Sequence, residues 1–585
     1  MSDEELLIKL ESTTRDATRH QLEALQSILK RNSGVRYLQR HFQRYNAPID
    51  VANFRRALPL SSYEDYFDDI NRLADGPLDH DHDHRDDQPL LSVDPLVCFF
   101  YSSGTSSMKP KLIPYYDSSL SKAASHLAHQ GSVAIHRRLF PPRPSANKVL
   151  WFIYADNVTI TKGGFKVMAA SSYPFHSSSR TNLSQLTVSA SPREVILGSN
   201  VEHQMYCHLL CGLRNSDFID GIRAPYAIGL IKVFYLLESK WEQLCDDLEN
   251  GFPSFEISDA AMKSSVTEVL GGPQLELSKR FRLIFQEENW GGIVNKLWPN
   301  VRYVRCVTTG SMEQYYPKLK HYAEGVPLIG GDYFASECCV GINLDIMQPP
   351  ETTRFVMLPT AAYFEFLPYD PNKIDAISEE TVDFSGVEVG KMYEVVVTTF
   401  RGFYRYRLGD IVRVVGFYNS SPQVEFVMRA PKALSDIITE RDLMSAIESF
   451  KLVLRNEMAI EITEFASFLD LNLSPKRLKV FVEVRKECMF KQEKLQESVV
   501  VLRRICSDIE YNLGGLYKVQ RDRGEAGSLL VTVIKPGSFE TLSQVAIENG
   551  APASQYKPPK IIRNHEIVHI LERSALVTVC SDFVE

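Results

Sequence analysis

The sequence has no long apolar run and no basic, apolar start. No stretch approaches the roughly 18–20 apolar residues that a bilayer-spanning helix needs. The first residues, MSDEELLIKLESTT, are acidic and lack the basic start and apolar centre of a secretory signal. We therefore expect a cytoplasmic protein that does not bind membranes.

The sequence also lacks an excess of positive charge. Its net charge is −8 and its isoelectric point is about 6.0. Because nucleic acid phosphates attract basic surfaces, this balance argues against nucleic acid as a partner. We expect small-molecule partners instead.

Cysteine pairs with metal-binding spacing are missing as well. Among the ten cysteines, Cys338 and Cys339 are adjacent, and Cys207 and Cys211 are four apart. Neither pair has the C-x-x-C spacing of zinc sites, so buried free thiols in a reducing cytosol are the simplest interpretation. The loop at 76–89, GPLDHDHDHRDDQP, alternates histidine with aspartate. A solvated loop is favoured there over a metal site, since no fixed fourth ligand is evident.

What is present is an ordinary soluble composition, with 44% hydrophobic and 24% charged residues. The 585 residues predict two to four domains, at about 150 residues each. Strand-like and helical runs alternate in the first part of the chain, which predicts an α/β architecture. After about residue 430 a helix, a strand, a long helix and a strand predict a compact α+β domain. The runs that support this division are strands at 96–101, 148–154, 301–310, 363–369, 478–484 and 528–534, a hairpin at 392–418, and helices at 227–249, 257–270, 440–452 and 492–512.

The stretch FFYSSGTSSMKPK at 99–111 joins an apolar run to small hydroxyl-bearing residues and two lysines. It lacks the second glycine of a Walker loop. Backbone N–H groups, hydroxyls and nearby cations can nevertheless surround a phosphate. From this stretch alone, a phosphate loop and a serine-rich turn both remain open.

Two further stretches reduce that ambiguity. GGDYFASECCVGIN at 330–343 has Tyr333 and Glu337 four residues apart, and YRYRLGDIVRVVGF at 404–417 has Gly409-Asp410 between strand-like runs. In order and spacing, the three stretches resemble the nucleotide motifs of adenylate-forming enzymes. The most similar group is the plant acyl acid–amido synthetases, the auxin-responsive Gretchen Hagen group. The strings that carry this resemblance through the chain are YCHLLCGL, GGIVNKLWPN, TTGSMEQYYPKLKHYA, YRYRLGD and GAPASQYKPPK.

The resemblance implies a reaction and a fold. ATP and Mg²⁺ would activate a small-molecule carboxylic acid as its adenylate, and an amino acid would then attack the acyl carbon. A large N-terminal domain, residues 1–428, would contain a β-barrel and sheets flanked by helices. A smaller, mobile α+β domain, residues 429–585, would follow. The enzyme is expected to be a monomer.

The resemblance also implies roles for individual residues in nucleotide binding. Glu337 would bind Mg²⁺, which prefers oxygen ligands. Lys557 would enter with the C-terminal domain and neutralise charge at the α-phosphate. The remaining nucleotide-binding positions are Ser102, Ser103 and Thr105 for the phosphates, Tyr333 for the adenine, Asp410 for the ribose, and Phe334, Ala335 and Ser336 in the same motif as Tyr333.

A second set of positions would bind the acid. Relatives tend to carry Thr, Phe, His and Trp where this chain has Ala123, Leu127, Gly331 and Cys339. Losing two large aromatic rings opens space, so a bulkier or differently shaped acid should fit. Because the overall resemblance is to the jasmonate branch of the family rather than the auxin branch, we expect jasmonate or an oxidised or otherwise modified jasmonate. The complete predicted set is Ala123, Leu127, Ser171, Ser172, Tyr173, Tyr226, Gly331 and Cys339.

Some positions depart from the family pattern. Met108 stands where relatives usually have glycine, and the segment 434–443 is shorter by about three residues than their hinge region. Because the predicted nucleotide residues are kept, we expect the core reaction to be retained. The alternatives are an auxin or benzoate-type acid as substrate, an acyl-CoA ligase, and a non-catalytic hormone-binding relative.

Overall fold

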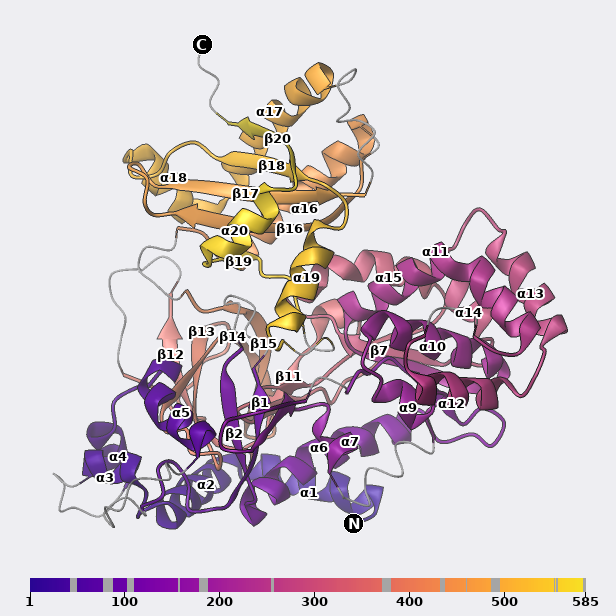
Figure 1. The fold of residues 1–585 in the computed structure, drawn as a ribbon. Helices are drawn as coiled ribbons and strands as arrows, with labels where there is room; N and C mark the ends of the chain where they lie inside the picture. The colour runs from indigo at the N-terminus through magenta and orange to yellow at the C-terminus, as the bar shows by residue number, and fades with distance from the viewer. Residues whose placement is uncertain are drawn as a thin grey trace. The chain divides into compact units, whose positions relative to one another are not determined.

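The computed structural model describes residues 1–42, 50–76, 88–102, 110–155, 158–177, 188–253, 257–370, 380–431, 437–458, 460–485, 495–551, 553 and 556–581 (Figure 1). The chain forms two compact units. One comprises Met1–Ser102 and Leu112–Phe426, and the other comprises Ser103–Lys111 and Val427–Glu585. The predicted domains, 1–428 and 429–585, differ from these limits and stay a prediction. Most of the histidine loop, Met108 and part of the predicted hinge lie outside the described residues.

Helices form the beginning of the first unit. Helix α1 begins with a capping box, in which Ser2 and Glu5 bond each other's backbone N–H groups. It packs on α6 at Gly131, where an added Cβ would lie 2.6 Å from Leu10. A glycine is therefore needed for this close helix approach. The N-terminal helices and α6 are α1 (Asp3–Arg15), α2 (Ala17–Arg31), α3 (Arg36–Phe42), α4 (Val51–Ala57), α5 (Phe67–Asp75) and α6 (Ser119–Leu139).

A four-stranded sheet follows, in the order β2-β1-β5-β4. Its strands are β1 (Leu96–Tyr101), β2 (Leu112–Tyr116), β4 (Thr159–Ile160) and β5 (Lys166–Ala169). Strands β1 and β2 pair antiparallel, with Tyr101 opposite Leu112. The serine-rich stretch therefore begins and ends at neighbouring positions of one sheet.

The second sheet, β3-β6-β7-β8, is entirely parallel. Parallel sheets are usually covered by helices on both faces. The hydrophobic core that joins this sheet to its helices includes the fully buried Trp298. Its elements are β3 (Lys148–Trp151), β6 (Ile219–Tyr226), β7 (Tyr303–Val307), β8 (Leu328–Gly330), α9 (Arg193–Ile196), α10 (Val201–Arg214), α11 (Ala227–Asn250), α12 (Ala260–Leu270), α13 (Leu275–Phe285), α14 (Ile293–Leu297) and α15 (Tyr316–Tyr322).

The third sheet has seven strands in the order β12-β13-β14-β15-β11-β10-β9. Among the described residues this sheet has β12 and β9 at its edges, and β9 has only two residues for pairing. The strands are β9 (Tyr333–Phe334), β10 (Cys339–Ile342), β11 (Phe355–Met357), β12 (Tyr363–Tyr369), β13 (Met392–Thr398), β14 (Tyr406–Tyr418) and β15 (Ser421–Arg429).

The second unit is an α+β domain built on a mixed sheet, β19-β16-β17-β18-β20. Alternate residues of its strands face two separate cores. Phe465 and Val480 belong to the core with α16 and α17, and Ala466 and Phe481 belong to the core with α19 and α20. The elements are β16 (Ile462–Asp470), β17 (Arg477–Val484), β18 (Leu530–Ile534), β19 (Ile561–Ile562), β20 (Ala575–Cys580), α16 (Glu440–Met458), α17 (Leu495–Asn512), α18 (Gly514–Asp522), α19 (Ser538–Glu548) and α20 (His565–Glu572).

The α/β fold class predicted from the sequence is confirmed by these mixed layers of helices and sheets. Within the described ranges, all nine cysteines are free thiols, and eight of them are buried. The same part of the chain contains no helix with the length and apolar character of a bilayer span.

A buried ion pair joins the seven-stranded sheet to the N-terminal helices. Arg405 donates to both carboxylate oxygens of Glu365, at 3.1 and 3.0 Å. It also donates to the carbonyls of Arg55 and Leu58, at 2.8 and 2.7 Å. Only 6% of the Arg405 side chain and 1% of the Glu365 side chain are exposed. Both charged side chains of this pair are therefore shielded from water.

We predict that Glu365→Gln destabilises the protein strongly. The change leaves the Arg405 charge buried without its counter-ion, which typically costs roughly 3–5 kcal/mol. Urea denaturation followed by tryptophan fluorescence measures the loss. Glu388→Gln is the control, because Glu388 pairs with Lys391 at an exposed site and its change should leave the unfolding midpoint nearly unchanged. Equal midpoints for the two variants would contradict the prediction.

Candidate active site

The structure brings two of the predicted nucleotide residues into direct contact. The hydroxyl of Tyr333 donates to Oδ2 of Asp410 at 2.6 Å. Asp410 lies in a bulge of β14, because the register between β13 and β14 shifts opposite Val395. Gly409 has a φ of +77° in this bulge, a conformation that favours glycine. The Gly-Asp sequence thus turns the carboxylate of Asp410 toward Tyr333.

Aromatic rings fix the position of Tyr333. Its ring centroid lies 5.4 Å from that of Phe355 and 6.1 Å from that of Phe426. Tyr333 itself is half-buried, whereas Asp410 is only 4% exposed. A rigid tyrosine beside a buried carboxylate suits a planar base with an attached sugar, so the predicted roles fit this geometry.

The loop between β9 and β10 carries the other residues of the same motif. Its turn is closed by a hydrogen bond of 3.0 Å from the Ala335 N–H to the Cys338 carbonyl. Ser336 donates through its hydroxyl to the Tyr101 carbonyl at 3.0 Å, and its own carbonyl accepts from Arg401. These contacts join the loop to the end of β1, directly before Ser102.

The far end of the serine-rich stretch is also held. The hydroxyl of Tyr63 accepts from the Leu112 N–H at 2.9 Å and donates to the Leu112 carbonyl at 3.2 Å. Burial raises the pKa of Tyr63 to about 12, and the negative charge of Glu337 adds to this shift, so the hydroxyl keeps its proton. Ser102 lies at the described start of the stretch, while Ser103 and Thr105 lie outside the described residues.

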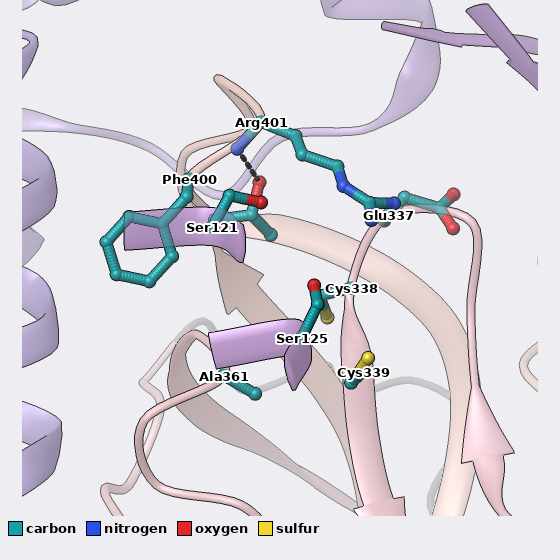
Figure 2. A pocket seen from close by; sticks show the side chains of 9 residues that line it. Ser121, Ser125, Glu337, Cys338, Cys339, Ala361, Phe400 and Arg401 are labelled. Carbon is teal, nitrogen blue, oxygen red and sulfur yellow. Dashed lines mark hydrogen bonds between the residues drawn. The ribbon is translucent and has the colours of Figure 1, made fainter. Parts of the chain in front are cut away.

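A pocket lies beside this loop (Figure 2). Helix α6, the loop after β9 and the turn after β13 supply its walls. Glu337, which is 8% exposed, lines it together with Cys339. The complete lining is Ser121, Ser125, Glu337, Cys338, Cys339, Ala361, Thr399, Phe400 and Arg401.

The face of α6 toward the pocket differs from the predicted one. Ser121 and Ser125 line the pocket, whereas Ala123 and Leu127 are absent from its lining. Ala123 is exposed, and Leu127 is buried in the hydrophobic core. At 3.6 residues per turn, positions two apart lie nearly opposite each other on a helix. The roles of Ala123 and Leu127 in acid binding stay predictions.

His129 continues the pocket face of α6 by one further turn. Its Nε2 lies 3.9 Å from the Sγ of Cys339, and its ring meets Phe334 edge-on at 4.6 Å. Burial would raise the pKa of the Cys339 thiol, but the His129 imidazole lowers it, and the net shift is downward. Cys338, which lines the same pocket, has its pKa raised well above the usual value by burial. The two adjacent cysteines therefore differ chemically.

Aromatic side chains form a further wall. The ring of Tyr173 lies 4.9 Å from that of Tyr115 and 5.7 Å from that of Phe100. The guanidinium of Arg401 lies 5.2 Å from the centre of Tyr115 and 5.4 Å from that of Phe100. Tyr173 thus belongs to an aromatic cluster that reaches the pocket through Arg401.

The remaining acid-binding positions lie on three neighbouring elements. Tyr226 ends β6 and pairs with Val307, and an added Cβ on Gly331 would lie 2.9 Å from the same Val307 side chain. Ser171 and Ser172 precede the short helix α7 (Tyr173–His176). Tyr226 and Gly331 therefore meet around Val307, and their predicted contact with the acid stays a prediction.

Lys557 lies in the second unit, on the segment before β19. The backbone of this segment is joined to β16, since the Lys560 carbonyl accepts from the N–H and the hydroxyl of Ser467 at 2.7 and 3.0 Å. The Lys560 ammonium is buried and pairs with Glu464. This buried pair fixes the backbone three residues beyond Lys557, whose catalytic role stays a prediction.

Three models of one protein family match successive parts of the chain. Residues 6–328 match the family model described as "GH3 family N-terminal domain", 355–429 match "GH3 family central domain" and 441–566 match "GH3 family C-terminal domain". The chain belongs to the GH3 family. The resemblance stated from the sequence is thereby confirmed.

Curated GH3 relatives cover most of the chain. "Jasmonoyl--L-amino acid synthetase GH3.5" of Oryza sativa subsp. japonica is 33% identical over 98% of this chain and 97% of its own length. "Probable indole-3-acetic acid-amido synthetase GH3.6" of the same plant is 46% identical over 67% of this chain and 82% of its own length. A solved structure, "GH3.15 acyl acid amido synthetase", has a TM-score of 0.84 at 30% identity, covering 99% of this chain and 97% of that one.

These similarities confirm the fold and, at the level of the family, the prediction of a ligase that joins acids to amino acids.

Sequence reasoning missed Ser121, Ser125, His129 and Arg401. The first three recur every four residues, so reading α6 by its faces would have revealed them. Arg401 gave no signal of its own, because its neighbours meet only in the folded chain.

The acidic side chain at the pocket suits a magnesium ion that takes most of its ligands from a bound nucleotide. Glu337 offers one buried carboxylate at the pocket, and no group of three histidine, cysteine or acidic side chains elsewhere in the described chain could hold a metal. Mg²⁺ typically takes one or two protein carboxylates and completes its shell with phosphate and water oxygens. Glu337 would therefore hold the ion only when nucleotide phosphates supply other ligands.

We predict that Asp410→Ala weakens ATP binding far more than acid binding. Hydrogen bonds to a charged carboxylate contribute about 1.5–3 kcal/mol each, so the Kd for ATP should rise roughly 10- to 150-fold. Isothermal titration calorimetry measures both ligands. Asp75→Ala, at a half-exposed ion pair with Lys162, is the control. An unchanged ATP affinity in Asp410→Ala would remove this residue from the nucleotide site.

Proposed function

We propose that this protein is an acyl acid–amido synthetase that uses ATP. A carboxylate attacks the α-phosphorus of ATP, and pyrophosphate leaves as the acyl-adenylate forms. The amine of an amino acid then attacks the acyl carbon, and AMP leaves as the amide forms. Activation is needed because a free carboxylate has no good leaving group.

One structural observation supports this proposal most strongly. Three segments far apart in the sequence, ending at Tyr101, spanning 333–339 and spanning 399–410, are joined by hydrogen bonds around one pocket. Each carries part of a predicted nucleotide motif. The GH3 relatives named above are amido or amino acid synthetases by name, and these names support the same reaction.

The protein's residues would serve the reaction in distinct ways. Tyr333 and Asp410 would bind the adenosine, with Asp410 accepting from the ribose hydroxyls. Glu337 would hold Mg²⁺, which supplies charge stabilisation at the phosphates. Lys557 would neutralise charge at the α-phosphate once the C-terminal domain, 429–585, has turned toward the nucleotide.

For the acid, we propose jasmonate or a jasmonate derivative. Cys339 lines the pocket where relatives usually carry Trp, so space is left for a substituted, flexible acid. An indole-type acid is the second candidate, because the relative with 46% identity is named for indole-3-acetic acid. Full-length relatives named for the two acids are 33% and 32% identical to this chain, so overall identity favours neither.

A pyrophosphate-release screen tests the proposal. The full-length protein is incubated with ATP, Mg²⁺, a panel of jasmonates, auxins and benzoates, and each of the twenty amino acids, and products are identified by mass spectrometry. Amide formation with a jasmonate supports the proposal. Pyrophosphate release that needs coenzyme A instead would indicate a CoA ligase, and acid binding without turnover would indicate a non-catalytic relative.

We predict that Glu337→Gln abolishes Mg²⁺-dependent pyrophosphate formation without unfolding the protein. The substitution is nearly isosteric, yet it removes the charge that a hard cation requires. Pyrophosphate exchange as a function of Mg²⁺ concentration measures the effect. Glu276→Gln, at an exposed ion pair in α13, is the control and should behave as wild type. A wild-type magnesium dependence in Glu337→Gln would place the metal elsewhere.

We predict that Cys339→Trp shifts preference toward smaller acids. A ring added at the pocket gains contacts with a small ligand and clashes with a larger one. The ratio of kcat/KM for jasmonate to that for its bulkier derivatives should rise roughly 10- to 200-fold.

Leu127→Phe is the companion variant. If Leu127 contacts the acid, as the resemblance implies, its ratio moves in the same direction. If it only fills the core, stability changes and the ratio does not. An unchanged ratio in a well-folded Cys339→Trp protein would contradict the assignment of this position to the acid.

A further inference from the structure

Arg401 lines the pocket but has no role in the motifs described above. It lies in the tight turn between β13 and β14, where its N–H donates to the hydroxyl of Thr399 at 3.1 Å. The N–H of Thr399 donates to the Phe403 carbonyl at 2.8 Å and closes the turn. Gly402 has a φ of +82° and lies against Leu91, which fixes the turn further. The backbone of Arg401 is therefore well defined.

The guanidinium is placed by its neighbours as well. It lies over the rings of Phe100 and Tyr115 and donates one N–H to the Ser336 carbonyl. An arginine side chain has five N–H donors, so most of them remain for another acceptor. Figure 2 shows the side chain extending along the pocket toward Glu337.

Among the described residues Arg401 forms no ion pair, although its side chain is half-buried and Glu337 lines the same pocket. By contrast, Arg405, four residues later in the same segment, is fully paired with Glu365. A half-buried guanidinium beside aromatic faces favours an anion that can accept two hydrogen bonds.

We propose that Arg401 binds the carboxylate of the acyl acid before that carboxylate is activated. The inference rests on the proposed synthetase function and names the residue that recognises the charged end of the substrate. The carboxylate would lie at the Glu337 end of the pocket, and the apolar body of the acid would lie toward Cys339 and Ala361.

This arrangement explains two features of the pocket. Glu337 carries negative charge, which would repel a carboxylate that had no cation beside it. Arg401 offsets that repulsion and leaves one oxygen of the acid available to attack phosphorus. The planar guanidinium also fixes the plane of the carboxylate, which a lysine could not do.

The experiment compares charged and uncharged forms of one ligand. Wild type, Arg401→Gln and Arg401→Lys are titrated with jasmonic acid, its methyl ester and ATP by isothermal titration calorimetry. If another acid gives more pyrophosphate in the screen, that acid and its methyl ester are used. Arg413→Gln, an arginine of β14 outside the pocket lining that lies 3.8 Å from Glu425, is the matched control.

Arg401→Gln should weaken binding of the acid roughly 10- to 100-fold, as expected for lost charge-assisted hydrogen bonds. Its affinities for the methyl ester and for ATP should change less than about twofold. Arg401→Lys keeps the charge without the planar fork, so its loss for the acid should be intermediate. If Arg401→Gln does not fold, the acid-to-ester affinity ratio of Arg401→Lys decides, and it should fall below that of wild type.

Three results would overturn the assignment. They are binding of the acid to Arg401→Gln as tightly as to wild type, an equal loss of affinity for the acid and the ester, and a loss of affinity for ATP instead of the acid. The last result would assign Arg401 to a phosphate. A wild-type protein that neither binds nor turns over any acid of the panel would overturn the proposed function itself, and this failure is distinguishable because it does not depend on Arg401.

Discussion

The ion pair between Arg405 and Glu365 is the constraint on which the architecture of the first unit depends. Arg405 is one of two described residues other than glycine with a positive φ, at 47°. A left-handed conformation costs an ordinary residue about 1–2 kcal/mol. The two hydrogen bonds to Glu365 and those to the carbonyls of Arg55 and Leu58 offset that cost. The chain accepts local strain because the whole network is buried.

The consequence of this constraint reaches the candidate site. Strand β14 begins at Tyr406, directly after Arg405. The bulge with Gly409 and Asp410 follows a few residues later in the same strand. The turn with Arg401 lies on the other side of Arg405, between β13 and β14. Arg405 therefore fixes the backbone between two side chains of the candidate site: the guanidinium of Arg401 precedes it in the sequence, and the carboxylate of Asp410 follows it.

The site also illustrates how differently neighbouring residues can be used. Cys338 and Cys339 are adjacent, yet only Cys339 contacts His129. Burial raises the pKa of both thiols, but His129 turns the net shift of the Cys339 pKa downward. Arg401 and Arg405 are four residues apart, yet one is fully paired inside the protein and the other faces the pocket. Sequence distance predicts neither difference, because strand alternation and turn geometry decide which side chain faces which neighbour.

By itself the sequence determined the family, the α/β class, the helix predicted at 227–249, the strand at 363–369 and the three segments that carry the nucleotide motifs. These features depend on local periodicity or on residues close together in the chain. Only the tertiary structure decided which face of α6 meets the pocket, that Tyr333 bonds Asp410, and that Arg401 reaches the Ser336 carbonyl. Each of these contacts joins residues that lie 65 or more positions apart, or depends on a two-residue shift around a helix. The free energy that selects them comes from burial of the whole unit, which no local pattern of residues contains.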